Sequence, residues 1–176
     1  MEPELLGWPP DGPKLELDYR SFSYAGKFVM TNTGKAVVRE GDEIRAAAAF
    51  NEDRTDPATL WIRYITTHDE HRGEGLGPRL LGFVRERALE RGYGTVRIAV
   101  NNPFAYEACH RAGFGYTGRE TGIAELVLEA PAEPTTERYQ KGLDVFRERD
   151  PEDPERSFLE RKRGVDPPSG EDGRDG

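Results

Sequence analysis

Residues 72–77, Arg-Gly-Glu-Gly-Leu-Gly, have the composition of a phosphate-binding loop. The three glycines lack side chains that would hold a ligand away from the backbone, and glycine tolerates positive φ angles. Pro78 suits the first turn of a helix, and the apolar residues that follow recur at helical spacing, which predicts a helix over 76–91. A glycine loop that leads into a helix N-terminus presents unpaired N–H groups to an anion. The segment therefore predicts a phosphate site.

Two common nucleotide-binding motifs do not fit this loop. A Walker A loop ends in Gly-Lys-Ser/Thr, whereas the chain has Gly77-Pro78-Arg79 at that point. A dinucleotide-binding loop follows the pattern G-x-G-x-x-G, and neither Gly73 nor Gly75 starts a segment that has the last glycine. A nucleotide-binding P-loop or Rossmann protein is therefore disfavoured. The structural alternative is a glycine-rich turn that only joins a strand to a helix.

A second informative block lies at residues 94–114. Alternating apolar residues over 96–100 predict a strand with one apolar face. Asn102 and Pro103 end this strand and start a short helix, which closes at Gly113.

The two blocks, in this order and at this separation, resemble the GNAT superfamily of N-acyltransferases, and the resemblance covers roughly residues 35–128. In that family a strand, an R/Q-x-x-G-x-G/A loop and a helix precede a second strand and the pattern N-x-x-A-x-x-x-Y-x-x-x-G-F. Asn102, Ala105, Gly113 and Phe114 match that pattern here. The resemblance implies a GNAT fold and acetyl-CoA as the acetyl donor.

The resemblance also implies how acetyl-CoA is bound. Backbone N–H groups near the end of the strand 59–67 would polarise the thioester carbonyl, loop amides would hold the pyrophosphate, and Asn102 would contact the pantetheine arm. Arg72 is the side chain expected to meet phosphate charge, and a solvated loop arginine is the alternative. The expected acetyl-CoA-binding residues are Ile65, Thr66, Thr67, Arg72, Gly73, Glu74, Gly75, Leu76, Gly77, Pro78 and Asn102.

The proton donor is the point at which the chain departs from the family pattern. Cys109 occupies the tyrosine position, and His110 lies beside it. A free thiol has a pKa of about 8.5 and a histidine titrates nearer pH 7, so each is a candidate acid. Successive helical residues point about 100° apart, so both cannot face the thioester. The alternative is a small buried cysteine beside a surface histidine.

The base that deprotonates the amine is expected in the turn after the strand 59–67. Glu70 is the candidate, and an ordered water is the alternative, because the strand itself contains no acidic residue. His68 and His71 lie three residues apart, but no third ligand pattern accompanies them, so no metal is expected.

Composition limits the partners and the location. The chain has 176 residues, of which 35% are hydrophobic and 33% charged, with a net charge of −8. This acidic balance argues against a general nucleic-acid or anionic-membrane surface. One cysteine excludes an internal disulfide framework, no stretch is apolar enough to span a membrane, and the N-terminus lacks a signal-peptide pattern. We expect a cytoplasmic protein, monomeric or homodimeric, that acts on a small-molecule or peptide amine.

Turn residues and periodicity predict the other elements. A first strand is expected over 15–19, and Gly41-Asp42 joins a hairpin of strands 35–40 and 43–51. Residues 21–33 are too few for the two helices that the family usually has there. Two final strands are expected over 114–117 and 123–128.

The chain beyond Ala130 is predicted to be a helical extension. Tyr139, Leu143 and Phe146 form an apolar stripe on a helix over 135–149, which needs a partner surface, and a second helix is expected over 153–164. The expected division is an irregular arm over 1–13, an acetyltransferase domain over 14–129, a helical extension over 130–164 and a disordered tail over 165–176.

These predictions combine into a GNAT-like α/β fold, with a mixed, partly parallel central sheet flanked by helices and a C-terminal helical extension. The expected function is acetyl-CoA-dependent N-acetyl transfer to a primary amine that the sequence does not identify. The alternative, which the missing tyrosine motivates, is an acyl-CoA-binding regulatory or scaffolding module with weak or no catalysis.

Overall fold

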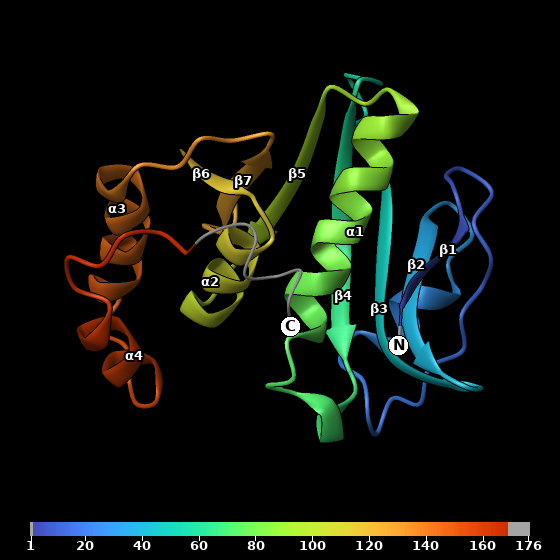
Figure 1. Ribbon diagram of the computed structural model, residues 1–176, viewed down its shortest axis with the longest axis horizontal. Coiled ribbons are helices and arrows are strands. Elements are labelled where there is room, and N and C mark those ends of the chain that lie inside the picture. Colours follow the sequence, from blue (N-terminus) through green and yellow to red (C-terminus); the bar gives the residue numbers. More distant parts are fainter. Residues whose placement is uncertain (1, 169–176) are drawn as a thin grey trace. The chain divides into compact units, whose positions relative to one another are not determined.

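The computed structural model describes residues 2–168, and within them the fold is a mixed, partly parallel seven-stranded sheet with four α-helices (Figure 1). The strand order is β1-β2-β3-β4-β5-β7-β6. This confirms the predicted fold class. The chain forms two compact units, an N-terminal unit that ends at Val96 and a C-terminal unit that begins at Arg97.

The N-terminal unit is built on four antiparallel strands. These are β1 (Pro3–Gly7), β2 (Gly34–Glu40), β3 (Glu43–Glu52) and β4 (Thr59–Thr67). Helix α1 (Leu76–Arg91) packs on these strands, as Figure 1 shows. The other face carries a second apolar cluster, in which Leu15 and Phe28 pack against Val37, Ala47 and Ala49. The alanines of β3 are all buried, because their small side chains let α1 and the segment before β2 lie close to the sheet.

The first residues of the chain correct two expectations. Pro3–Gly7 forms the edge strand β1 and is not irregular, and the segment 15–19 is not a strand. Proline is tolerated at the start of an edge strand, and β2 supplies the ladder partner. In the second segment Asp18 accepts hydrogen bonds from Ser21 and Phe22, which turns the chain, while Tyr19 is 81% exposed.

Strand β4 carries a bulge in its middle. Ala49 pairs with Tyr64 and the next residue, Phe50, pairs with Ile62, so Arg63 has no residue opposite it. An extra residue of this kind bends a strand and re-aims its side chains, and such bulges are common beside functional sites. The short segment before β2 contains one 3-10 helix, Ala25–Val29, which agrees with the expectation that two full helices do not fit there.

The C-terminal unit contains α2 (Pro103–Arg111), β6 (Gly115–Glu120) and β7 (Leu126–Ala130); β5 (Thr95–Val100) spans the boundary between the units. The two final strands were predicted with wrong limits. Gly118, expected in the turn, lies inside β6 with a φ of 84° at an irregularity of the β6–β7 ladder. The turn itself falls later, where the Ala124 N–H bonds the Thr121 carbonyl.

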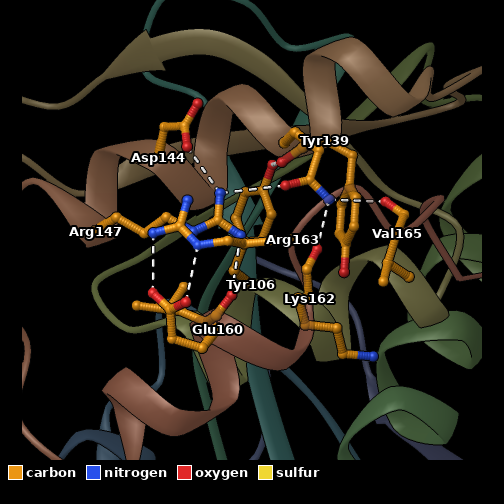
Figure 2. A network of polar contacts seen from close by, with 10 residues as sticks. Tyr106, Tyr139, Asp144, Arg147, Glu160, Lys162, Arg163 and Val165 are labelled. Atoms are coloured by element: carbon orange, nitrogen blue, oxygen red, sulfur yellow. Dashed lines mark hydrogen bonds and ion pairs between the residues drawn. The ribbon is translucent and has the colours of Figure 1, made fainter.

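The helical extension forms α3 (Thr136–Arg147) and α4 (Glu155–Arg161). The predicted apolar stripe is buried, and α3 packs on β6 while α4 packs on α2. Two side chains of α3 join it to the end of α4, and Figure 2 labels one of them, Arg147, together with Lys162 and Val165. Gln140 donates to the carbonyls of Lys162 and Val165 at 2.7 and 2.8 Å, and Arg147 donates to the Leu159 carbonyl at 3.0 Å.

The predicted domain limits, 14–129 and 130–164, stay a prediction. Of the tail predicted to be disordered, residues 169–176 lie outside the described residues, and 165–168 have no regular secondary structure. Within residues 2–168 no helix is long and apolar enough to cross a membrane.

Candidate active site

The end of β4 lies against the start of α1. Ile65, Thr66 and Thr67 pair with Ala48, Ala47 and Ala46 of β3. In an antiparallel pair, a strand bonds one neighbour through every second residue, so at least one of these three amides points away from β3. A Cβ placed on Gly77 would lie 4.0 Å from the Thr67 hydroxyl. The predicted carbonyl-polarising strand end and the predicted phosphate loop are therefore adjacent.

The glycine loop has the geometry of an anion site. Gly73 and Gly75 have φ angles of 84° and 78°, which glycine adopts readily and other residues rarely do. Gly75 is the N-cap of α1, and no side chain caps the helix there. The first amides of α1 therefore have no capping side chain, and they carry the positive end of the helix dipole.

Charged side chains of the loop are tied to neighbours. The Arg72 guanidinium lies 2.9 Å from the Asp69 carboxylate, and its side chain is largely exposed. Glu74 lies 3.0 Å from the His71 ring, which also faces Glu43 at 3.5 Å. Because these side chains are engaged, the backbone amides stay the predicted anion donors of the loop, as the family resemblance implies.

Glu70, the predicted base, is exposed in the 3-10 turn Asp69–His71. Its backbone N–H donates to the His68 ring at 3.1 Å, which fixes the turn that carries the carboxylate. His68 also packs edge-on against Phe22, with 5.2 Å between ring centroids. Within residues 2–168 no three His, Cys, Asp or Glu side chains are grouped as metal ligands.

Asn102 is the N-cap of α2. Its side-chain oxygen accepts from the Ala105 N–H at 2.8 Å, and Pro103 follows in the first turn, as a helix start requires. The predicted contact of Asn102 with pantetheine stays a prediction, and the structure adds a capping role.

The two candidate acids are both in the core of the C-terminal unit. Cys109 is 1% exposed, and burial raises the pKa of its thiol to about 12. His110 is also 1% exposed, and burial lowers its pKa to about 4, although the Glu107 charge opposes this shift. The alternative that placed His110 on the surface is wrong, and at pH 7 the imidazole is neutral and cannot donate the proton of an imidazolium.

The surroundings of His110 are mostly aromatic. Its ring centroid lies 4.7 Å from that of Tyr106 and 4.9 Å from that of Tyr139. Neither ring nitrogen has a hydrogen-bond partner among the described residues. A buried polar group without a partner costs stability, and burial without hydrogen bonds disfavours the charged imidazolium, which lowers the pKa of His110.

Sequence reasoning missed the polar contacts that hold this core together. The Tyr139 hydroxyl donates to Glu107 at 2.5 Å, and the Lys162 ammonium lies 2.8 Å from the same carboxylate. The Tyr106 hydroxyl donates to the Tyr139 carbonyl at 2.9 Å. The cluster joins side chains from α2, α3 and the C-cap of α4, so it becomes visible only when the helical extension is packed. Figure 2 shows Tyr106, Tyr139 and Lys162.

Sequence reasoning also missed a cavity on the N-terminal unit, lined in part by Trp61, Arg63 and Tyr64 of β4. The signal for it in the sequence is that Trp61, Arg63 and Tyr64, which are large and polar or aromatic, lie in the middle of the otherwise mostly apolar strand β4.

Comparison with known proteins identifies the family. The model of the acetyltransferase (GNAT) family matches residues 3–114, which is well over half of the chain. No curated protein sequence matches.

Several solved structures are similar. An acetyltransferase from Bacillus subtilis, solved in complex with CoA, is 18% identical with a TM-score of 0.55, and the match covers 73% of this chain and 96% of that one. An N-acetyltransferase from Staphylococcus aureus Mu50 is 20% identical with a TM-score of 0.49, over 55% of this chain and 66% of that one. A ribosomal-protein-alanine N-acetyltransferase from Brucella melitensis is 15% identical with a TM-score of 0.49, over 55% and 67%.

These likenesses concern the fold, and the first matched structure is covered over slightly less than two thirds of its length. The family model, the loop between β4 and α1, and the block from β5 to the end of α2 agree with one another. The chain belongs to the GNAT family of acetyltransferases.

Proposed function

We propose that the protein is an acetyl-CoA-dependent N-acetyltransferase that acetylates a primary amine. The observation that carries this proposal is the uncapped N-terminus of α1, which follows two left-handed glycines and lies beside the end of β4. That arrangement can hold a pyrophosphate through backbone amides and place the adjoining thioester against the strand.

Each step of the transfer has a candidate group in the chain. Acetyl-CoA supplies a thioester; its C–S bond breaks while a C–N bond to the amine forms. An amide at Ile65, Thr66 or Thr67 that points away from β3 would stabilise negative charge on the carbonyl oxygen. Glu70, or a water bound near it, would accept the proton that the amine loses. The thiolate of CoA then takes a proton and leaves as the thiol.

Neither candidate acid is a good proton donor for the leaving thiolate. Cys109 is a poor acid because burial raises its pKa to about 12, and His110 is neutral at pH 7. Thiolates are good leaving groups, so the reaction needs only modest acid assistance, and solvent can supply it. Catalysis without a strong protein acid is therefore part of the proposal.

A second function, an acyl-CoA-binding regulatory or scaffolding module, is favoured by the same buried Cys109 in place of the family tyrosine. The two functions share the binding loop and differ only in turnover.

Two measurements test the proposal. Calorimetric titration with acetyl-CoA, CoA and ATP should show binding of the first two only; tight binding of ATP alone would refute both functions. A turnover assay with acetyl-CoA and a panel of primary amines should then give N-acetylated product. Binding of acetyl-CoA without product from any amine class would favour the regulatory module.

A cytoplasmic location, a monomer or homodimer, and a small-molecule or peptide amine as partner are proposed on the sequence argument given above.

A further inference from the structure

A cavity of about 580 Å³ lies in the N-terminal unit, between residues 27–33 and the strands β3 and β4. Aromatic and apolar side chains form part of its wall, namely Trp61 and Tyr64 of β4 and Met30 of the segment before β2. Neither the glycine loop nor α1 contributes to this wall. The cavity is therefore separate from the predicted phosphate site, although β4 borders both.

Three cations line the cavity in a chain whose net charge is −8. They are Lys27, Arg54 and Arg63, and the largest charge effect on Arg63 is the attraction of Asp53, which also lines the cavity. Arg63, the bulge residue of β4, donates to the Asn51 side chain at 2.7 Å and lies 5.0 Å from the Trp61 ring. The Lys27 ammonium lies 5.9 Å from the Tyr64 ring.

The environment of Arg63 disfavours additional positive charge. Burial lowers the pKa of its guanidinium, the Asp53 charge opposes this shift, and the smaller effect of the Arg54 charge adds to it. An anion placed among these groups would relieve the repulsion between them.

Two carboxylates also line the cavity, and each accepts at least one hydrogen bond from a neutral group. Asp53 accepts from the Trp61 ring N–H at 2.7 Å and from the Thr55 hydroxyl at 2.9 Å. Glu52 accepts from the Tyr93 hydroxyl at 2.9 Å. The wall contains three positive and two negative side chains, so its net charge is +1. A ligand with one negative charge neutralises this net charge, whereas a dianion would leave the filled cavity negative.

The spacing along β4 relates the cavity to the site of transfer. Arg63 precedes Ile65 by two residues and Thr67 by four. At about 3.3 Å per residue, the backbone of Arg63 lies about 7–13 Å from residues 65–67 along β4. A molecule that bridges this span would be several bonds long.

We propose that this cavity binds the acceptor, and that the acceptor carries a carboxylate several bonds from its amine. This inference rests on the proposed acetyltransferase function and names its substrate class. Arg63 and Lys27 hold the carboxylate, because guanidinium and ammonium groups donate charge-assisted hydrogen bonds to it. Trp61 and Tyr64 contact the apolar body between the two ends, and the amine extends towards the end of β4.

A pair of probes tests the charge requirement. 4-(Aminomethyl)benzoate has its amine and carboxylate at opposite ends of a ring, and 4-(aminomethyl)benzamide is the neutral match. A hydrogen bond to a charged group typically contributes about tenfold or more in affinity, so the benzoate should be acetylated with at least about a tenfold higher kcat/KM. Equal values for the two amines, or a preference for the amide, would overturn the inference.

A matched pair of variants tests the location. Arg63→Gln should reduce the preference for the benzoate over the benzamide to below about threefold. The substitution removes the guanidinium, whose N–H groups can bond both oxygens of a carboxylate. Arg91→Gln is the control, since Arg91 also lies over a tryptophan, Trp8, at 4.5 Å, and is not part of the cavity. The control should keep the full preference. An unchanged preference in Arg63→Gln would place the carboxylate elsewhere and refute the assignment.

Binding without acetyl-CoA separates this inference from the proposed function. The benzoate should change the fluorescence of Trp61, and Trp61→Phe should abolish that change. Binding of the benzoate without turnover of either amine would refute the acetyltransferase proposal and leave the cavity assignment standing. Turnover of both amines at the same rate would support the acetyltransferase proposal and refute the cavity assignment. Absence of binding, or tighter binding of 4-(aminomethyl)benzylphosphonate than of the benzoate, would refute the carboxylate assignment.

Discussion

In the N-terminal unit, the candidate ligand-binding groups are open. A Cβ added at Gly73 of the loop would meet nothing within 4 Å, the first amides of α1 lack a capping side chain, and three cations line a cavity. In the C-terminal unit, the candidate acids Cys109 and His110 are buried in a core of tyrosines and apolar side chains. The first unit therefore contains most of the proposed binding groups, while α2 packs against the helical extension and its candidate acids are poor proton donors.

The largest effect is expected at the closest packing in the C-terminal unit. A Cβ on Gly142 of α3 would overlap the hydroxyl and ring of Tyr106. Gly142→Ala should therefore destabilise the protein by about 3 kcal/mol, as overpacking in a core does, even though alanine is normally better than glycine in a helix. Chemical denaturation measures the change. Gly122→Ala, where the added Cβ meets nothing, is the control. A stabilised Gly142→Ala protein would show that the core is looser than described.

The next effect concerns pH. The folded pKa of His110 is lowered to about 4 from 6.5, so between these values the unfolded chain binds a proton that the folded chain does not. Stability therefore falls as pH falls from about 6.5 to 4, by about 2 kcal/mol at pH 5 relative to pH 8. His110→Leu should remove this part of the pH dependence and be more stable than the parent at pH 5. Denaturation at both pH values in the two proteins measures it, and parallel pH profiles would contradict the burial of His110.

The third prediction tests whether the glycine loop binds the pyrophosphate of acetyl-CoA. Gly75→Val puts a branched side chain at the N-cap of α1, where phosphate would approach, and should weaken acetyl-CoA binding by well over tenfold. Gly41→Val is the matched control for backbone strain, because Gly41 also has a positive φ, of 61°, and lies in the β2–β3 turn. Calorimetry on the two folded variants gives the comparison. Normal affinity in Gly75→Val would exclude the loop as the phosphate site.

The smallest effect is expected at Cys109. Its raised pKa makes the thiol a poor acid, so Cys109→Ala should keep kcat within about tenfold, below the usual contribution of general acid catalysis. Cys109→Tyr restores the family residue type and should keep or raise turnover if the core accepts the ring. His110→Ala should leave the acidic limb of the pH–rate profile in place, since the imidazole is already neutral there. A thousandfold loss in Cys109→Ala, with normal acetyl-CoA binding, would show that the buried thiol is catalytic.

The elements that local signals define were predicted well. The loop and α1 follow from three glycines, a proline and apolar spacing, and the structure places α1 at 76–91 as expected. The β2–β3 hairpin follows from the turn at Gly41, and α2 from Asn102 and Pro103. Even the alanine run of β3, which helix propensity alone would assign to a helix, was predicted as a strand from its position between a turn and the next strand.

Tertiary contacts decided the rest. Pro3–Gly7 is a strand because β2 offers an unpaired edge, and residues 15–19 are not, because Leu15 bonds Phe28 and Asp18 turns the chain. The protonation of His110 depends on burial to which Tyr139, about 30 positions away in sequence, contributes, and no local pattern records this contact. The cavity requires three separate segments to meet. Sequence determined the elements and the family because those depend on neighbouring residues, and only the tertiary structure decided solvation and charge, which depend on long-range packing.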